Sequence, residues 1–232
     1  MNSSDIKEYA LTHGADLVGI ADLTLLKERF PVSPPHLLDG YHRGISIGIS
    51  LDRAIVEEIV DGPTEAYADH YRQTNRNLDD LADQLVDWIR ERGHRALAVP
   101  ASDVIDKEDW RGAISHRAVG RLAGLGWSGK SLMLINPDYG PSFRLATVLT
   151  DMDLTPDTPM ENRCGSCTLC TDACVAGAIL DRGTETFYEK RSEAVDLDRC
   201  VSMLRDFKAR RGIGAMVCGV CIKACPYGQA KF

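Results

Sequence analysis

The chain has 232 residues, of which 44% are hydrophobic and 26% are charged, and its formal net charge at pH 7 is −7. This length supports one good hydrophobic core and a small additional module, and the composition is typical of a soluble globular protein. The negative charge argues against an extended nucleic-acid surface. No apolar run reaches the ~20 residues of a membrane-spanning helix. We therefore expect neither nucleic acid nor a membrane among the partners.

Helix and strand patterns alternate along the first two thirds of the chain. A helix is expected at residues 5–13, with Ser4 as its N-cap and Gly14 at its end. The further expected elements are strands at 16–21, 45–51, 95–100, 131–136 and 145–150, a helix through 78–89 that ends at Gly93, and a helix at 113–123. This order predicts a mixed α/β layer domain, of the α/β (α+β) class.

A glycine-rich loop follows the helix expected at residues 113–123. Residues 124–131 read GLGWSGKS and match the pattern of a phosphate-binding loop letter by letter. Such a loop needs a strand before it and a helix after it, because the phosphates bind at the N-terminus of that helix. Here a helix precedes the loop and an apolar strand follows it, so we do not expect this loop to bind a nucleotide. A tight helix-to-strand turn is the simplest alternative.

A linker rich in proline separates the α/β region from the rest of the chain. Residues 153–159 read DLTPDTP, which indicates a boundary near residue 158. We therefore expect an α/β domain at residues 1–158 and a second domain at residues 159–232.

All eight cysteines lie in this second domain. The first run has the spacing C-x2-C-x2-C-x3-C, one cysteine stands alone, and the last three have the spacing C-x2-C-x3-C and are followed by Pro226. Eight thiolates are what two [4Fe–4S] clusters require, and the first run has the bacterial ferredoxin spacing. Structural zinc does not explain three cysteines at three-residue intervals. Disulfide bonds suit a small secreted scaffold better than a long chain with a cysteine-free first half.

The ferredoxin rule also predicts which cysteines share a cluster. The fourth cysteine of a run faces away from the first three, so it serves the other cluster. The first cysteine set is then expected to be Cys164, Cys167, Cys170 and Cys225. The second cysteine set is expected to be Cys174, Cys200, Cys218 and Cys221. Cys200 replaces a ligand that a ferredoxin repeat would place three residues before Cys218.

Basic residues exceed acidic ones around the last cysteines. Between Arg199 and Lys231 there are seven arginines and lysines, against Asp206 alone. One interpretation is that they compensate the negative charge of the clusters and their thiolates. The other is a docking face for a low-potential electron donor, such as a ferredoxin or flavodoxin, with an acidic surface.

Several segments resemble two related families. Residues 123–130 (AGLGWSGK), 136–141 (NPDYGP) and the cysteine runs resemble epoxyqueuosine reductase and the catalytic half of the corrinoid-dependent reductive dehalogenases. This resemblance implies a nitroreductase-like domain that binds cobalamin (a corrinoid), followed by a ferredoxin-like domain with two clusters. By the resemblance, the corrinoid-lining residues would be Gly124, Gly126, Trp127, Gly129, Lys130, Pro137, Tyr139, Gly140 and Arg144.

One histidine is a candidate proton donor. His116 lies just before the glycine-rich loop, and histidine titrates near neutral pH. The alternative is a structural histidine on a helix surface or at its cap. The aspartate that epoxyqueuosine reductases carry in an Asp-x-Gly-Pro motif falls on Trp110 in this chain, with Asp109 adjacent but out of register.

These features predict an oxidoreductase that passes electrons through two [4Fe–4S] clusters to a bound corrinoid. Its reaction would be the reduction of a small molecule or of the corrinoid itself. The alternatives are an electron-transfer protein with two clusters and no corrinoid, and a tRNA epoxyqueuosine reductase. The N-terminal residues have no secretory or twin-arginine signal, and reduced thiolates suit a reducing compartment, so we expect a cytoplasmic protein.

Overall fold

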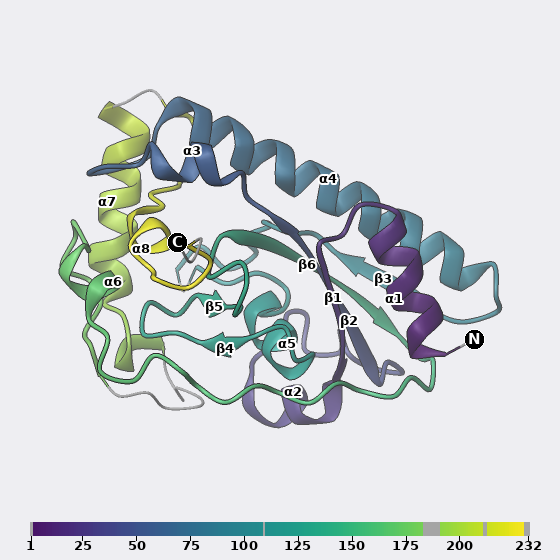
Figure 1. Ribbon diagram of the computed structural model, residues 1–232. Coiled ribbons are helices and arrows are strands. Elements are labelled where there is room, and N and C mark those ends of the chain that lie inside the picture. The colour runs from purple at the N-terminus through teal and green to yellow at the C-terminus, as the bar shows by residue number, and fades with distance from the viewer. Residues whose placement is uncertain (1, 109, 183–190, 211–212, 230–232) are drawn as a thin grey trace. The chain divides into compact units, whose positions relative to one another are not determined.

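The structure is a computed structural model, and it describes residues 2–108, 110–182, 191–210 and 213–229 (Figure 1). The chain forms two compact units, each assembled from separate stretches of sequence. The first unit comprises Met1–Ser50, Thr74–Leu125 and Arg144–Met160. The second comprises Leu51–Gln73, Gly126–Phe143 and Glu161–Phe232.

A four-stranded sheet forms the centre of the first unit. Its order is β1 (Leu17–Asp22), β2 (Arg43–Ser50), β6 (Phe143–Thr150) and β3 (Ala96–Val99). Strands β1 and β2 are antiparallel, with Ile20 opposite Ile45, and β3 and β6 are antiparallel, with Ala98 opposite Val148. This arrangement confirms the expected mixed α/β class.

Helices cover both faces of this sheet (Figure 1). On one face, α1 (Ser3–Thr12) and the later part of α4 (Glu65–Arg90) bury a core with Ile20, Ile45 and Val148. On the other face lie α2 (Leu23–Arg29) and α5 (His116–Leu122). Because side chains alternate along a strand, the small residues between the isoleucines face α5. A Cβ atom on Gly19 would lie 2.1 Å from the carbonyl oxygen of Ala123, so only glycine allows this close packing.

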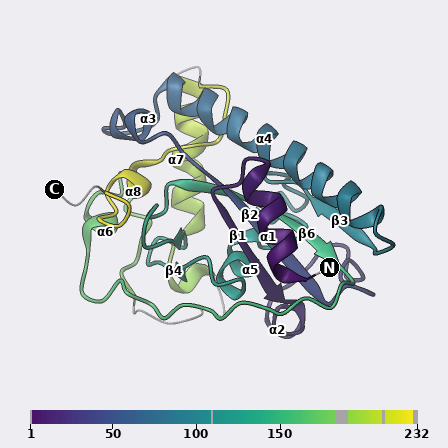
Figure 2. The same cartoon turned by 45° about the vertical axis from the view of Figure 1, so that its right-hand side comes forward.

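The second unit consists of short elements around the cysteines. These are α3 (Arg53–Glu57), β4 (Trp127–Ser128), β5 (Leu134–Ile135), α6 (Leu169–Asp172), a 3-10 helix at Arg191–Glu193, α7 (Leu197–Arg210) and α8 (Val220–Lys223), together with residues 65–73 of α4. Figure 2 shows α6 and α8 beside each other, and the two helices are in contact. Two small apolar clusters hold the unit together, one around Ile59 and Tyr67 and one around Ile179 and Val195.

Three local expectations need correction. The N-cap of α1 is Asn2 instead of Ser4, because Asn2 accepts hydrogen bonds from two backbone amides and the Asp5 carboxylate in turn accepts one from the backbone amide of Asn2. Helix α4 begins at Glu65, well before the apolar spacing that indicated it, since its first turns carry polar residues. The strand expected at 131–136 is reduced to Leu134–Ile135.

The predicted division into two domains, at residues 1–158 and 159–232, stays a prediction. The first compact unit ends at Met160, near the predicted boundary, but the second unit also recruits residues 51–73 and 126–143. No helix in the described part of the chain is long and apolar enough to cross a membrane.

Candidate iron–sulfur site

The glycine-rich loop forms a β-hairpin in the second unit. Trp127 in β4 pairs with Ile135 in β5. A Cβ atom on Gly126 would lie 2.1 Å from the carbonyl oxygen of Ile135, and one on Gly129 would lie 2.8 Å from its side chain. No helix follows Lys130 before β5, so the loop lacks the helix N-terminus that a phosphate site needs.

This hairpin lines a cavity together with the first cysteine set. Cys164, Cys167, Cys170 and Cys225 surround the cavity. Its remaining wall is formed by Gly129, Lys130, Ser131, Ile135, Pro226 and Tyr227. Thus the fold brings together the four cysteines that the ferredoxin rule assigns to one cluster, including the exchanged Cys225. A cavity with four convergent thiols fits a [4Fe–4S] cluster.

The second cysteine set is gathered by apolar packing. Cys174, Cys200 and Cys221 pack against the apolar cluster around Ile179, where Cys170 of the first set also packs, and Cys218 and Cys221 contact the cluster around Ile59. Electrostatics also connects these residues. Burial raises the pKa of the Cys221 thiol well above its usual range, and the thiols of Cys218, Cys200 and Cys174 raise it further, with the smallest contribution from Cys170 of the first set.

Burial and neighbouring thiols also raise the pKa of a cysteine in the first set. Burial raises the pKa of Cys225 to about 11, with contributions in the same direction from Cys164, Cys170 and Cys167. Buried thiols that repel one another as thiolates favour the neutral form, unless a metal compensates their charge. All eight cysteines are free, so none is used in a disulfide bond. Within the described ranges, no group of three or more cysteine, histidine or acidic residues is arranged to hold a single metal ion.

Glycines shape the loops that carry the ligands. Gly219 follows Cys218 with a φ of 85°, and a Cβ atom there would lie 2.5 Å from Ile59 Cδ1. Gly140 has a φ of 57°, and a Cβ atom there would lie 2.0 Å from the carbonyl oxygen of Tyr227. The turn at residues 136–140 therefore lies directly against the segment after Cys225.

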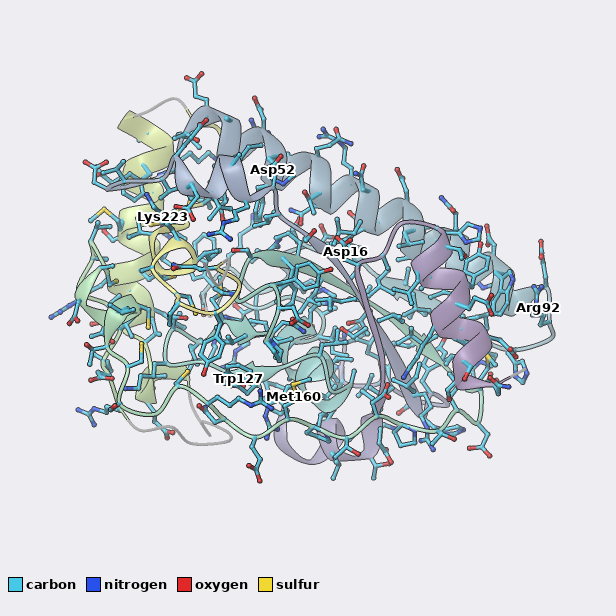
Figure 3. All side chains as sticks on the ribbon, in the orientation of Figure 1. Asp16, Asp52, Arg92, Trp127, Met160 and Lys223 are labelled. Atoms are coloured by element: carbon cyan, nitrogen blue, oxygen red, sulfur yellow. The ribbon has the colours of Figure 1, made fainter. Side chains whose placement is uncertain are left out.

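Polar contacts connect the hairpin to the first cysteine set. Trp127, labelled in Figure 3, is fully buried and donates a hydrogen bond from Nε1 to Cys164 Sγ at 3.4 Å. Asn162 donates to the carbonyl oxygen of Ser128 at 2.7 Å and accepts from the backbone amide of Cys164 at 2.8 Å. Tyr227 donates its hydroxyl to the carbonyl oxygen of Arg163 at 2.9 Å.

Lys130 is a buried cation beside this cavity. Its side chain is 6% exposed, and its Nζ lies 2.6 Å from Asp181 Oδ1. The hydrogen bond to Asp181 raises the pKa of Lys130 and outweighs the opposite effect of burial, and Cys164 and Cys167 raise it further. The side chain is therefore an ammonium ion over the whole physiological pH range.

Sequence reasoning did not identify Asn162, Asp181 or Tyr227. The position of Asn162, two residues before the first cysteine, is compatible with an Asx turn, and Tyr227 directly follows the Cys-Pro pair. No pattern in the sequence connects Asp181 with Lys130, because the contact spans 51 residues of chain.

The residues predicted to line a corrinoid have other neighbours within their own units. Gly126, Gly129 and Lys130 lie in the hairpin at the cysteine cavity, and Tyr139 and Gly140 lie against the segment around Tyr227. In the first unit, a Cβ atom on Gly124 would lie 2.8 Å from the carbonyl oxygen of Thr158. Arg144 donates to Asn75 Oδ1 at 2.9 Å, and Pro137 is half-buried. These contacts do not form an open cradle, so the corrinoid-lining role stays a prediction.

His116 is held at both ring nitrogens in the first unit. Nε2 lies 2.9 Å from the carbonyl oxygen of Pro100, which can only accept, so Nε2 carries the proton. Nδ1 then accepts from Thr147 Oγ1 at 2.8 Å. Burial lowers the pKa of His116 to about 4, so the ring is neutral at pH 7. This geometry gives His116 a structural role, and its proposed function as proton donor stays a prediction.

An α/β unit and a unit with two interleaved four-cysteine sets define a two-cluster iron–sulfur protein. Residues 163–228 match the family described as "4Fe-4S double cluster binding domain". This match confirms that the cysteine-bearing segment is a 4Fe–4S cluster-binding domain.

The particular proteins that the chain resembles are epoxyqueuosine reductases. It is 34% identical to the Bacillus subtilis enzyme over 128 residues, which cover 52% of this chain and 31% of the relative. It is 26% identical to the Vibrio cholerae enzyme over 268 aligned positions, which cover 98% of this chain and 67% of the relative. The predicted resemblance is therefore confirmed, although the matched part is only about a third of the Bacillus subtilis protein.

The comparison with solved structures also finds epoxyqueuosine reductases. A crystal structure of epoxyqueuosine reductase with an epoxyqueuosine-modified tRNA-Tyr stem loop matches with a TM-score of 0.63 and 25% identity, over 98% of this chain and 65% of that one. A catabolic reductive dehalogenase in complex with 3-bromo-4-hydroxybenzoic acid matches with a TM-score of 0.75 over 97% of this chain and 31% of that one. At 19% identity, the second match shows a shared fold only.

The expectation that nucleic acid is absent from the partners is wrong. The matched relative was solved with a tRNA stem loop, and the curated relatives carry the name of an enzyme for a modified tRNA base. The expectation rested on the net charge of −7, which sums the whole chain. Nucleic-acid binding depends on the local field at one surface, and a net sum does not describe that field.

Proposed function

We propose that this chain is an iron–sulfur reductase whose substrate is epoxyqueuosine in tRNA. The observation that carries the proposal is the pair of interleaved cysteine sets in a chain that aligns over 98% of its length with an epoxyqueuosine reductase. Removal of an epoxide oxygen as water needs two electrons and two protons. Bound [4Fe–4S] clusters supply electrons one at a time.

The residues of the chain would hold and shield these clusters. The two cysteine sets provide the ligands, and the β4–β5 hairpin closes one side of the first cavity. Trp127 and Tyr227 meet edge to face, with ring centroids 4.8 Å apart, so an apolar surface lies beside the thiols. Limited access of water protects a reduced cluster and lowers the local dielectric constant.

Cobalamin remains a proposed cofactor. Its support is the shared fold with reductive dehalogenases, one of which was described with a mechanism for B12-dependent dehalogenation. The predicted corrinoid-lining residues form no open cradle within either unit, so we derive no step of the reaction from a corrinoid.

The test is a reduction assay with protein that has been purified and reconstituted without oxygen. An epoxyqueuosine-modified tRNA stem loop is incubated with the protein and dithionite, with and without cobalamin, and the loss of one oxygen atom from the base is followed by mass spectrometry. Product is expected from the wild type, and none from a Cys167→Ser variant. Absence of product from wild-type protein with full iron content and added cobalamin would refute the proposal.

The same samples test the alternative of an electron-transfer protein with two clusters. In that case the stem loop stays unreduced with and without cobalamin, while the clusters, once reduced with dithionite and freed of its excess, are reoxidised by a one-electron acceptor such as cytochrome c. The absorbance of the reduced cytochrome reports this electron transfer. The two functions therefore give different patterns in one experiment.

A further inference from the structure

We propose that Lys130 sets the reduction potential of the first cluster above that of the second. The proposal rests on the cluster assignment and does not require any particular substrate. It also explains the match of residues 124–131 to a phosphate-binding loop. The loop brings a lysine to an anionic group, and that group is a cluster with its thiolates in place of a phosphate.

The position of Lys130 makes its charge effective. Lys130 lines the cavity formed by the first cysteine set, and its side chain is only 6% exposed. A charge excluded from water is screened far less than a charge on the surface. Reduction adds one negative charge to the cluster, so a nearby fixed cation stabilises the reduced form and raises the potential.

Hydrogen bonds to sulfur reach both cysteine sets. In the first set, Trp127 donates to Cys164 Sγ at 3.4 Å and the backbone amide of Tyr227 donates to Cys225, and in the second, the backbone amide of Ala178 donates to Cys174 Sγ at 3.3 Å. Such donors also favour a reduced cluster, so the contribution of Lys130 is measured by substituting its charge.

The second cysteine set lies beside two apolar clusters. Its members pack against the clusters that contain Ile59, Ile179 and Val195, and Cys170 of the first set also packs against the cluster around Ile179. The lysine nearest to them in sequence, Lys223, donates its Nζ to the backbone carbonyl oxygens of Glu57 and Ile59, at 2.8 and 2.5 Å. Apolar surroundings disfavour the added negative charge and lower the potential.

Asp181 moderates the effect of Lys130. It neutralises part of the lysine charge at 2.6 Å, while its own side chain is 34% exposed and absent from the cavity wall. Asp181 has a φ of 51°, a left-handed conformation that asparagine adopts as readily as aspartate. The Asp181→Asn substitution should therefore remove the negative charge with little change in the backbone.

The experiment is an EPR-monitored redox titration of the full chain with both clusters reconstituted. In the Lys130→Met variant, the higher of the two potentials should fall, with a shift on the order of tenfold in the equilibrium for electron uptake, which is about 59 mV for a one-electron couple. In Asp181→Asn the same potential should rise. Lys130→Arg should restore the wild-type value, because it retains the charge.

Lys208→Met is the matched control. Lys208 belongs to the same unit and carries the same charge, but it is exposed on α7, so its removal should leave both potentials unchanged. The proposal is overturned if Lys130→Met moves the lower potential, if neither potential moves, or if Lys130→Met and Asp181→Asn shift in the same direction. If Lys130→Met fails to retain its clusters, the rise expected in Asp181→Asn still decides the question. Failure of tRNA reduction would leave these potentials unaffected.

Discussion

The contact between Gly140 and Tyr227 offers a quantitative test of how the hairpin region supports the first cluster. In a Gly140→Ala variant, the new Cβ atom would lie 2.0 Å from the carbonyl oxygen of Tyr227, which belongs to the backbone and has little room to move. The φ of 57° adds a second cost, since a left-handed conformation disfavours alanine by about 1–2 kcal/mol. Overpacking of a tight contact costs about 1–3 kcal/mol.

The substitution should therefore lower the free energy of unfolding of the second unit by about 2–5 kcal/mol. The assay is urea unfolding under anaerobic conditions, followed by loss of iron–sulfur absorbance. Because Tyr227 lines the first cysteine cavity, iron should also be lost faster from the native variant. Iron content before and after a fixed incubation measures this loss.

Gly177→Ala is the matched control for the backbone cost. Gly177 lies in the same unit with a φ of 55°, and the atom nearest to a Cβ at this position would be Arg199 Nη1, at 4.0 Å. The Gly177→Ala variant should lose only the part of the free energy of unfolding that comes from the left-handed backbone conformation, about 1–2 kcal/mol. Equal losses in the two variants would refute the reasoning, because they would mean that the approach to Tyr227 imposes no steric constraint.

Two further predictions concern the cluster assignment and the first unit. Cys200→Ala should weaken the cluster shared with Cys174 and leave about four irons per chain with one EPR signal; loss of both clusters would mean that the module folds only when both are filled. The lowered pKa of His116, about 4, means that the unfolded chain binds a proton below pH 6.5 that the folded chain does not. Stability should therefore fall as the pH decreases, by about 2 kcal/mol between pH 7 and pH 5. His116→Gln should lack this component in urea unfolding followed by circular dichroism, and an unchanged pH dependence would contradict the assignment.

Much of the architecture was predictable because local patterns and global packing agree. The alternation of isoleucine with small residues in β2 predicted a strand with close packing, and the structure places α5 against its small residues. Short elements such as α3, α6 and β4 were not predicted, because a helix of one turn or a strand of two residues has too little sequence for a periodic pattern.

The site was predictable in its ligands and not in its surroundings. Cysteine spacing reflects the local geometry of a loop around a cluster, so the sequence by itself predicts the eight ligands and their exchange between the two runs, and the structure places the first four predicted ligands around one cavity. The neighbours of that site are distant in sequence. Lys130 meets Asp181 across 51 residues, and Gly140 meets Tyr227 only where the chain folds back on itself.

The tertiary structure decided which atoms the glycine-rich loop contacts within its unit. From sequence, the loop was expected to form a tight turn or a corrinoid contact, and not a nucleotide site. The space beside Gly126 and Gly129 is filled by Ile135, and Lys130 lines the first cysteine cavity, because the β4–β5 hairpin packs onto the cysteine-bearing segment. Which atoms a loop contacts depends on contacts distant in sequence, and these form only when the whole unit is packed.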